Sequence, residues 1–79
     1  MKVILTEGLG RFKFGMSELQ TRYYITEDDQ EIADFTVGAG NYTLNEHAAF
    51  TDVEDKEALN KLIRRAFVVL DSTFRSNEA

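Results

Sequence analysis

The side chains that could do chemistry in this chain are mainly carboxylates. Fourteen of the 79 residues are Asp or Glu, cysteine is absent, and His47 is the only histidine. A thiolate nucleophile, a zinc-finger framework and a multi-histidine metal site are therefore excluded, and we expect no histidine-based triad. A catalytic carboxyl usually needs a desolvated setting that shifts its pKa, whereas these acids fall in predicted turns and at a predicted helix start. We expect no enzymatic activity, no cofactor and no metal site.

Two further motifs are incomplete. Residues 27–34 offer oxygen ligands for hard cations, but they lack the loop and closing Glu of an EF-hand. Gly8-x-Gly10 and Gly38-x-Gly40 do not continue as a dinucleotide or phosphate-binding fingerprint. We interpret both glycine pairs as turns.

The formal net charge of −5 is unevenly distributed along the chain. Residues 1–26 carry four basic and two acidic groups, a balance of +2, and residues 58–79 carry the same balance. Residues 27–57 carry ten acidic groups against Lys56 alone, a balance of −9. This concentration of acids is the most informative feature of the sequence.

The acidic segment suggests a small protein-binding module that engages a basic surface on a partner protein. Such a surface can occupy the site of a nucleic-acid-handling protein by imitating phosphate spacing. A short, acidic chain without cysteine or proline also has the general character of phage-type inhibitors of host machinery or defence. The alternative is that the acids only keep a β-turn soluble and protect a sheet edge. The candidate partner-binding residues are Glu27, Asp28, Asp29, Glu31, Asp34 and the aromatic Tyr24.

A helix over residues 52–75 is the element around which the fold is predicted to form. Thr51 and Glu54 have the spacing of a capping box, with Asp52 and Asp55 as a competing cap one residue later. Apolar residues then recur every three or four positions and form one stripe. The stripe consists of Leu59, Leu62, Ile63, Ala66, Phe67, Leu70 and Phe74.

Residues 1–50 predict a sheet. Alternating or β-rich segments at 2–6, 11–16, 22–26, 31–37 and 42–44 are separated by turn signals at 7–10, 27–30 and 38–41. Residues 17–21 fit either a wide turn or one turn of helix. We therefore expect a single α+β domain over residues 1–79, in which a four- to five-stranded antiparallel meander packs on the C-terminal helix.

Self-association is the alternative function. Ile4, Tyr24 and Ile32 are expected on the sheet face away from the helix, where a second copy would cover them in a homodimer. In that case the protein is a structural or accessory subunit.

The outer face of the helix offers a third interpretation. Arg64, Arg65 and Arg75 surround Val68 and form an alternative partner face. With Lys61, Arg11 and Lys13 these cations could bind phosphates, but a protein of net charge −5 is repelled by nucleic acid at long range. The phenylalanines Phe12 and Phe14 should face the core, away from Arg11 and Lys13.

The N-terminal residues contain too short an apolar run for a signal peptide or a membrane span. We expect a cytoplasmic protein, located in the host cytoplasm if phage-encoded, with no membrane partner.

Overall fold

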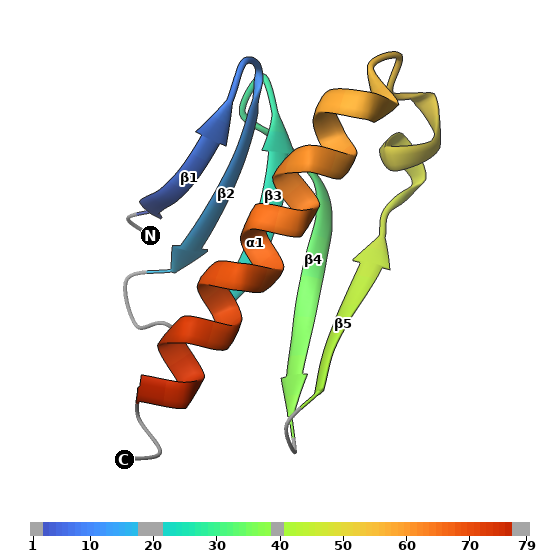
Figure 1. Ribbon diagram of the computed structural model, residues 1–79. Helices are drawn as coiled ribbons and strands as arrows, with labels where there is room; N and C mark the ends of the chain where they lie inside the picture. The colour runs from blue at the N-terminus through green and yellow to red at the C-terminus, as the bar shows by residue number, and fades with distance from the viewer. Residues whose placement is uncertain (1–2, 18–21, 39–40, 77–79) are drawn as a thin grey trace.

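The apolar segments form five strands and one long helix, as Figure 1 shows. The computed structural model describes residues 3–17, 22–38 and 41–76, and the side chains of residues 7–17, 22–38 and 41–72. The elements are β1 (Val3–Leu9), β2 (Phe12–Ser17), β3 (Tyr23–Glu27), β4 (Gln30–Gly38), β5 (Asn41–Glu46), the 3-10 helix η1 (Ala48–Asp52) and α1 (Lys56–Ser76).

The strands form one antiparallel sheet in the order β1-β2-β3-β4-β5. Each strand pairs with its neighbour in sequence, because short connections favour local pairing. The helix α1 crosses one face of this sheet diagonally (Figure 1). The predicted α+β fold, an antiparallel meander packed on a C-terminal helix, is confirmed with five strands.

The core lies between the sheet and α1. Phe12 and Phe14 are buried there as predicted. The ring of Phe35 from β4 meets Phe14 from β2 edge-on at 5.5 Å between centroids, and it meets Phe67 from α1 edge-on at 5.3 Å. Edge-to-face aromatic contacts of this kind add stability beyond the burial of apolar area. The helix contributes fully buried side chains from its predicted stripe: Leu59, Leu62, Ala66 and Leu70.

Two hairpins turn on residues with positive φ. The first strand is longer than predicted and continues to Leu9, so the turn consists of Gly10 and Arg11, with Gly10 at φ 61°. In the second hairpin, Asp28 and Asp29 adopt φ values of 50° and 70°. Positive φ at both central residues is the requirement of a type I′ turn, whose twist matches that of the strands. Other segments of the predicted loops, residues 18–21 and 39–40, lie outside the described residues.

A β-bulge in β4 overturns the predicted orientation of Ile32. Ile25 pairs with Ala33, whereas the next residue of β3, Thr26, pairs with Glu31, so Ile32 is an extra residue in β4. Ile32 is 1% exposed and belongs to the core, instead of the opposite face where strict alternation placed it. Tyr24 does lie outside the core cluster, and the side chain of Ile4 is outside the described residues.

The start of α1 also differs from the prediction. The helix begins at Lys56, four residues after the predicted start at residue 52, and the capping box of Thr51 and Glu54 is wrong. The Thr51 hydroxyl instead donates a hydrogen bond to the carbonyl of Ala48 within η1. The N-cap is Asp55, whose Oδ1 accepts a hydrogen bond of 3.1 Å from the backbone N–H of Ala58. The acids before Asp55 therefore belong to the connection into α1.

The position of Asp29 predicts a stabilising substitution. An L-residue in the left-handed region is strained by about 1 kcal/mol, and glycine is not. We expect Asp29→Gly to raise the free energy of unfolding by about 0.5–1 kcal/mol. Asp29→Ala should lower it. Urea unfolding measures both changes, and a destabilised glycine variant would contradict the type I′ turn.

The N-cap predicts a second pair of variants. Asp55→Ala removes the acceptor for the Ala58 N–H and should cost about 1 kcal/mol of stability. Asp52→Ala is the matched control, because Asp52 is exposed and precedes the helix, and it should change stability by less than about 0.5 kcal/mol. Thermal unfolding compares the two. A larger loss at Asp52 would favour the helix start predicted from the sequence.

Candidate functional site

The sheet face opposite α1 carries a cross-strand row of polar and aromatic residues. Tyr24 pairs with Asp34 across β3 and β4, and Asp34 pairs with Asn45 across β4 and β5. On its other side Tyr24 pairs with Gly15, which has no side chain to compete for space. Tyr24 is only 7% exposed although it is outside the core cluster. Tyr24 is therefore largely covered by its neighbours on this face.

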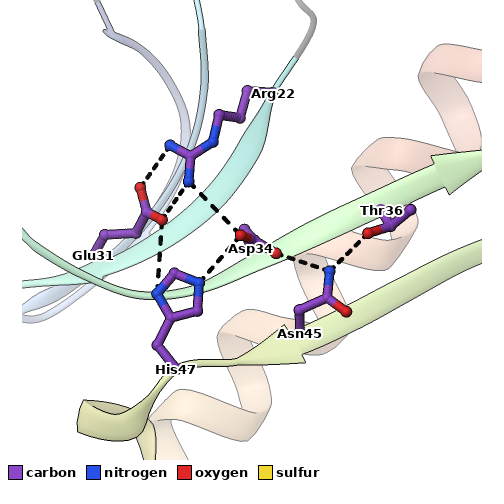
Figure 2. A network of polar contacts seen from close by, with 6 residues as sticks. All are labelled: Arg22, Glu31, Asp34, Thr36, Asn45 and His47. Atoms are coloured by element: carbon purple, nitrogen blue, oxygen red, sulfur yellow. Dashed lines mark hydrogen bonds and ion pairs between the residues drawn. The ribbon is translucent and has the colours of Figure 1, made fainter.

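Arg22 is the central cation of the face (Figure 2). Its guanidinium donates two parallel hydrogen bonds to Glu31, of 2.7 Å to Oε1 and 2.5 Å to Oε2. It also lies 3.7 Å from Oδ2 of Asp34 and 5.4 Å from the centre of the Tyr24 ring. The bonds to Glu31 raise the pKa of Arg22 above its ordinary value. Bidentate geometry makes this the strongest class of ion pair.

The bulge at Ile32 brings the two carboxylates together. Glu31 and Asp34 are three residues apart, and in a regular strand they would point to opposite faces. Because Ile32 is an extra residue, both reach the same Arg22. The C=O of Ile32 accepts a hydrogen bond of 3.0 Å from the N–H of His47, which directly follows β5. The bulge thus also positions the histidine.

His47 lies between the same two carboxylates, as Figure 2 shows. Its Nε2 is 3.1 Å from Oδ2 of Asp34, and its Nδ1 is 3.7 Å from Oε2 of Glu31. The other oxygen of Asp34 accepts a hydrogen bond of 2.8 Å from Asn45 Nδ2, which also donates one to the Thr36 hydroxyl at 2.7 Å. Each of the six side chains in the figure therefore has a polar partner.

The hydrogen bond from Asn45 is the main reason that the pKa of Asp34 lies below the ordinary value of an aspartate. Burial acts in the opposite direction and raises it. The hydrogen bond and the electrostatic interaction with His47, together with the charge of Arg22, lower the pKa of Asp34 further. Asp34 is thus held ionised by neighbours that the fold supplies.

Glu31, Asp34 and His47 are the group in the described chain that comes closest to a metal site. One ligand atom from each lies within 4.8 Å of the others. Two carboxylates and an imidazole are suitable ligands for a divalent cation. However, Arg22 already supplies the positive charge at this position, so a metal ion would have to displace its guanidinium. The geometry fits a polar network whose members pair with one another better than an open coordination site.

The six predicted partner-binding residues divide into two sets. Glu31, Asp34 and Tyr24 belong to the network around Arg22, whereas Glu27, Asp28 and Asp29 lie at the tip of the β3–β4 hairpin. Among the cations nearby, Arg11 lies 3.7 Å from Glu27 and Lys13 lies 4.0 Å from Asp29. Three of these four side chains are at least half exposed and Glu27 is partly exposed, so the pairs contribute little stability and the tip retains acidic character. The Asp29 side chain is 90% exposed.

The fold gathers acids from two parts of the sequence at one end of the molecule. The β1–β2 turn, the β3–β4 turn and the start of α1 lie at the same end of the molecule (Figure 1). The N–H of Asp28 donates to the carbonyl of Arg11, and Gly10, Arg11 and Asp55 line one shallow depression. We call this region the acidic end, and its acids are Glu27, Asp28, Asp29, Asp52, Glu54, Asp55 and Glu57. Against four cations there, Arg11, Lys13, Lys56 and Lys61, the seven acids leave a balance of −3.

Three residues of the predicted alternative partner face, Arg64, Arg65 and Val68, lie together on α1. Arg64, Arg65 and Val68 line an open depression of about 340 Å³ together with Glu7 and Val69. Val68 is 65% exposed, and Arg65 is paired with Glu7 of β1 at 3.5 Å. The side chain of Arg75 is outside the described residues.

Sequence reasoning missed Arg22, Asn45 and His47. They are separated from Glu31 and Asp34 by nine or more positions, and a bulge lies between the two carboxylates. Only the strand register could have indicated them, and the bulge changes that register.

This chain matches no protein-family model, and no curated protein or solved structure is significantly similar to it. Within the described part of the chain, no helix is long and apolar enough to cross a membrane.

The network predicts how Asp34 titrates. Its pKa is lower in the folded than in the unfolded state, so it contributes stability that is complete above the unfolded-state pKa and is lost as the pH falls through the folded-state pKa. Asn45→Ala should raise the pKa of Asp34 and reduce that contribution. Asn41→Ala, on the same strand but outside the network, should leave the pKa unchanged. Titration of the Asp34 carboxyl by NMR measures its pKa in the original chain and in both variants. An Asp34 midpoint in Asn45→Ala equal to that of the original chain would contradict the assigned role of Asn45.

Proposed function

We propose that this protein is a small protein-binding module whose acidic end engages a basic surface on a partner protein. The observation that carries the proposal is the gathering of hairpin acids and pre-helix acids at one end of the molecule. Clustered charge of one sign steers an oppositely charged partner and raises its rate of association.

The hairpin tip is the centre of the proposed surface. Asp28 and Asp29 occupy a two-residue turn with fixed backbone geometry, and the Asp28 N–H is bonded to Arg11 in the neighbouring hairpin. Because the backbone of this turn is already ordered, little backbone entropy is lost when a partner binds its carboxylates. Glu31, Asp34 and Tyr24 have a supporting role, because Arg22 is already within ion-pair distance of the first two and lies over the ring of the third.

The partner is proposed to be a protein that handles nucleic acid or acts in host defence, with this chain as its inhibitor. A phosphate-binding surface is basic, and closely spaced carboxylates can compete with phosphates for the same Lys and Arg side chains. The short, acidic chain supports this form of the proposal.

The test removes charge and preserves shape. Asn tolerates the left-handed region as Asp does, so Asp28→Asn with Asp29→Asn deletes two charges without forcing the turn to change. Glu46→Gln with Asp71→Asn deletes two charges outside the acidic end and is the matched control. Each immobilised protein is exposed to lysate of the source cells or their host, and captured proteins are quantified at low and high salt.

We expect the original chain and the control to capture the same basic protein, in amounts that fall with added salt. The hairpin variant should bind that protein about tenfold more weakly. Equal capture by the hairpin variant, or capture that is insensitive to salt, would overturn the acidic end as the binding surface. Competition between this chain and DNA or RNA for the purified partner then tests the inhibitor form.

A further inference from the structure

Among the side chains that the structure describes, Arg64 is the cation without an acidic or carbonyl partner. The others each have one: Arg11, Lys13, Arg22, Lys61 and Arg65 lie within 4.0 Å of a carboxylate, and Lys56 donates a hydrogen bond to a backbone carbonyl. The chain has fourteen acids for nine Lys and Arg residues, so acids that could pair with a cation are plentiful. An exposed arginine that stays unpaired in such a chain is available to a carboxylate from outside.

The next turn of α1 presents Val68. At 65% exposure it is the one large apolar residue that is exposed in the described part of the chain. It follows Arg64 by four positions, so the two side chains are neighbours on the helix surface. A single exposed valine is ordinary on a protein surface. Here, however, the exposed valine and the unpaired arginine line the same depression.

The depression combines apolar and charged side chains. Val68 and Val69 line it together with Arg64, Arg65 and Glu7, the last of which belongs to β1. Glu7 lies 3.5 Å from Arg65, so Arg64 is the cation left for an incoming carboxylate. The volume of about 340 Å³ is near the lower end of the range for binding pockets, about 300–1,000 Å³. It suits one or two side chains of a ligand.

We propose that this depression binds an acidic segment of a partner protein, in which an apolar side chain lies next to an Asp or Glu. The apolar side chain packs against Val68 and Val69 and removes their exposed surface from water. The neighbouring carboxylate accepts two parallel hydrogen bonds from the planar guanidinium of Arg64. The positive charge of Arg64 selects the acid, and the apolar contact selects the residue beside it.

Other anionic surfaces fit the depression less well. Nucleic acid is bound through many phosphate contacts, and an anionic membrane through several cations and a broad apolar face. Within the described residues, the depression offers one unpaired cation and one exposed apolar side chain. The net charge of −5 also repels a polyanion far more than a short segment with one or two acids.

This surface is independent of the acidic end, because the two take ligands of opposite charge. Asp28→Asn with Asp29→Asn should leave the binding of an acidic segment intact. Substitutions of Arg64 or Val68 should likewise leave the capture of a basic partner intact. The two proposals can therefore fail separately.

The test uses peptides of known sequence. A display library of short random peptides is selected on the immobilised full chain, and each enriched peptide is synthesised and titrated against the protein in solution. We expect enrichment of peptides that carry Asp or Glu next to Leu, Ile or Phe, with affinities that fall as salt is added. Enrichment of basic peptides alone, or of none, would overturn the proposal.

Two variants remove the two contacts in turn. Arg64→Gln deletes the cation and Val68→Ser deletes the apolar contact, and each should raise the dissociation constant of the enriched peptides about tenfold. Both positions are exposed, so circular dichroism should remain that of the folded protein. Val68→Leu keeps an apolar side chain and should bind like the original chain. Arg64→Lys keeps the charge without the bidentate geometry and should be intermediate. Lys13→Gln removes a cation outside the depression and should change nothing.

Unchanged affinity in both Arg64→Gln and Val68→Ser would overturn the proposal. Amide chemical shifts measured by NMR locate the bound peptide, and changes confined to residues outside the depression would equally contradict it. Two further measurements identify other occupants: binding of phosphatidylserine vesicles, and dimer formation in sedimentation. Either one, if lost in Arg64→Gln with Val68→Ser while the peptides do not bind, would assign the depression to a lipid surface or to a second copy and would overturn the acidic segment as its ligand.

Discussion

The extra residue in β4, Ile32, controls both faces of the sheet. Without a bulge, strict alternation would place Ile32 and Ala33 on opposite faces, and Glu31 and Asp34 on opposite faces as well. With it, Ile32 and Ala33 both enter the core, and both carboxylates reach Arg22. The Ile32 carbonyl also accepts the N–H of His47, so the same irregularity determines where β5 ends in relation to the network.

The network around Arg22 engages part of the acidic segment. Glu31 and Asp34 lie within ion-pair distance of one guanidinium, and Asp34 also accepts hydrogen bonds from Asn45 and, where protonated, His47. Removing such partners from a cluster this well paired costs free energy. Of the hairpin acids, Glu27 lies 3.7 Å from Arg11 and Asp29 lies 4.0 Å from Lys13, in pairs at or near the surface that contribute little stability. The fold therefore separates acids that are held in the sheet network from acids at the hairpin tip, whose ion pairs are longer.

Distinct parts of the fold carry the two proposals. The β1–β2 turn, the β3–β4 turn and the start of α1 lie at the acidic end. Two acidic ends would repel each other, because their charges have the same sign. The depression on α1 has a different character, because it is lined by the exposed Val68 and by Arg64, which has no ion pair among the described side chains.

The sequence by itself determined the type and order of the elements. Alternation identified the strands, the 3.6-residue stripe identified the helix, and short loops between successive strands required neighbours to pair. It also showed the acidic segment, since charge is a property of composition. These features depend on residues close together in the chain, and for that reason they could be predicted.

Only the tertiary structure decided the bulge, the helix start and the grouping of the acids. The bulge lets Ile32 enter a core that is built from distant strands. The residue pattern of β4 by itself does not predict this bulge. The choice of Asp55 over Thr51 as N-cap depends on η1, whose Phe50 is buried and accepts a bond from Lys56 at its carbonyl. The acidic end and the Arg22 network join residues far apart in sequence, and their proximity follows from strand register and packing, which local patterns do not encode.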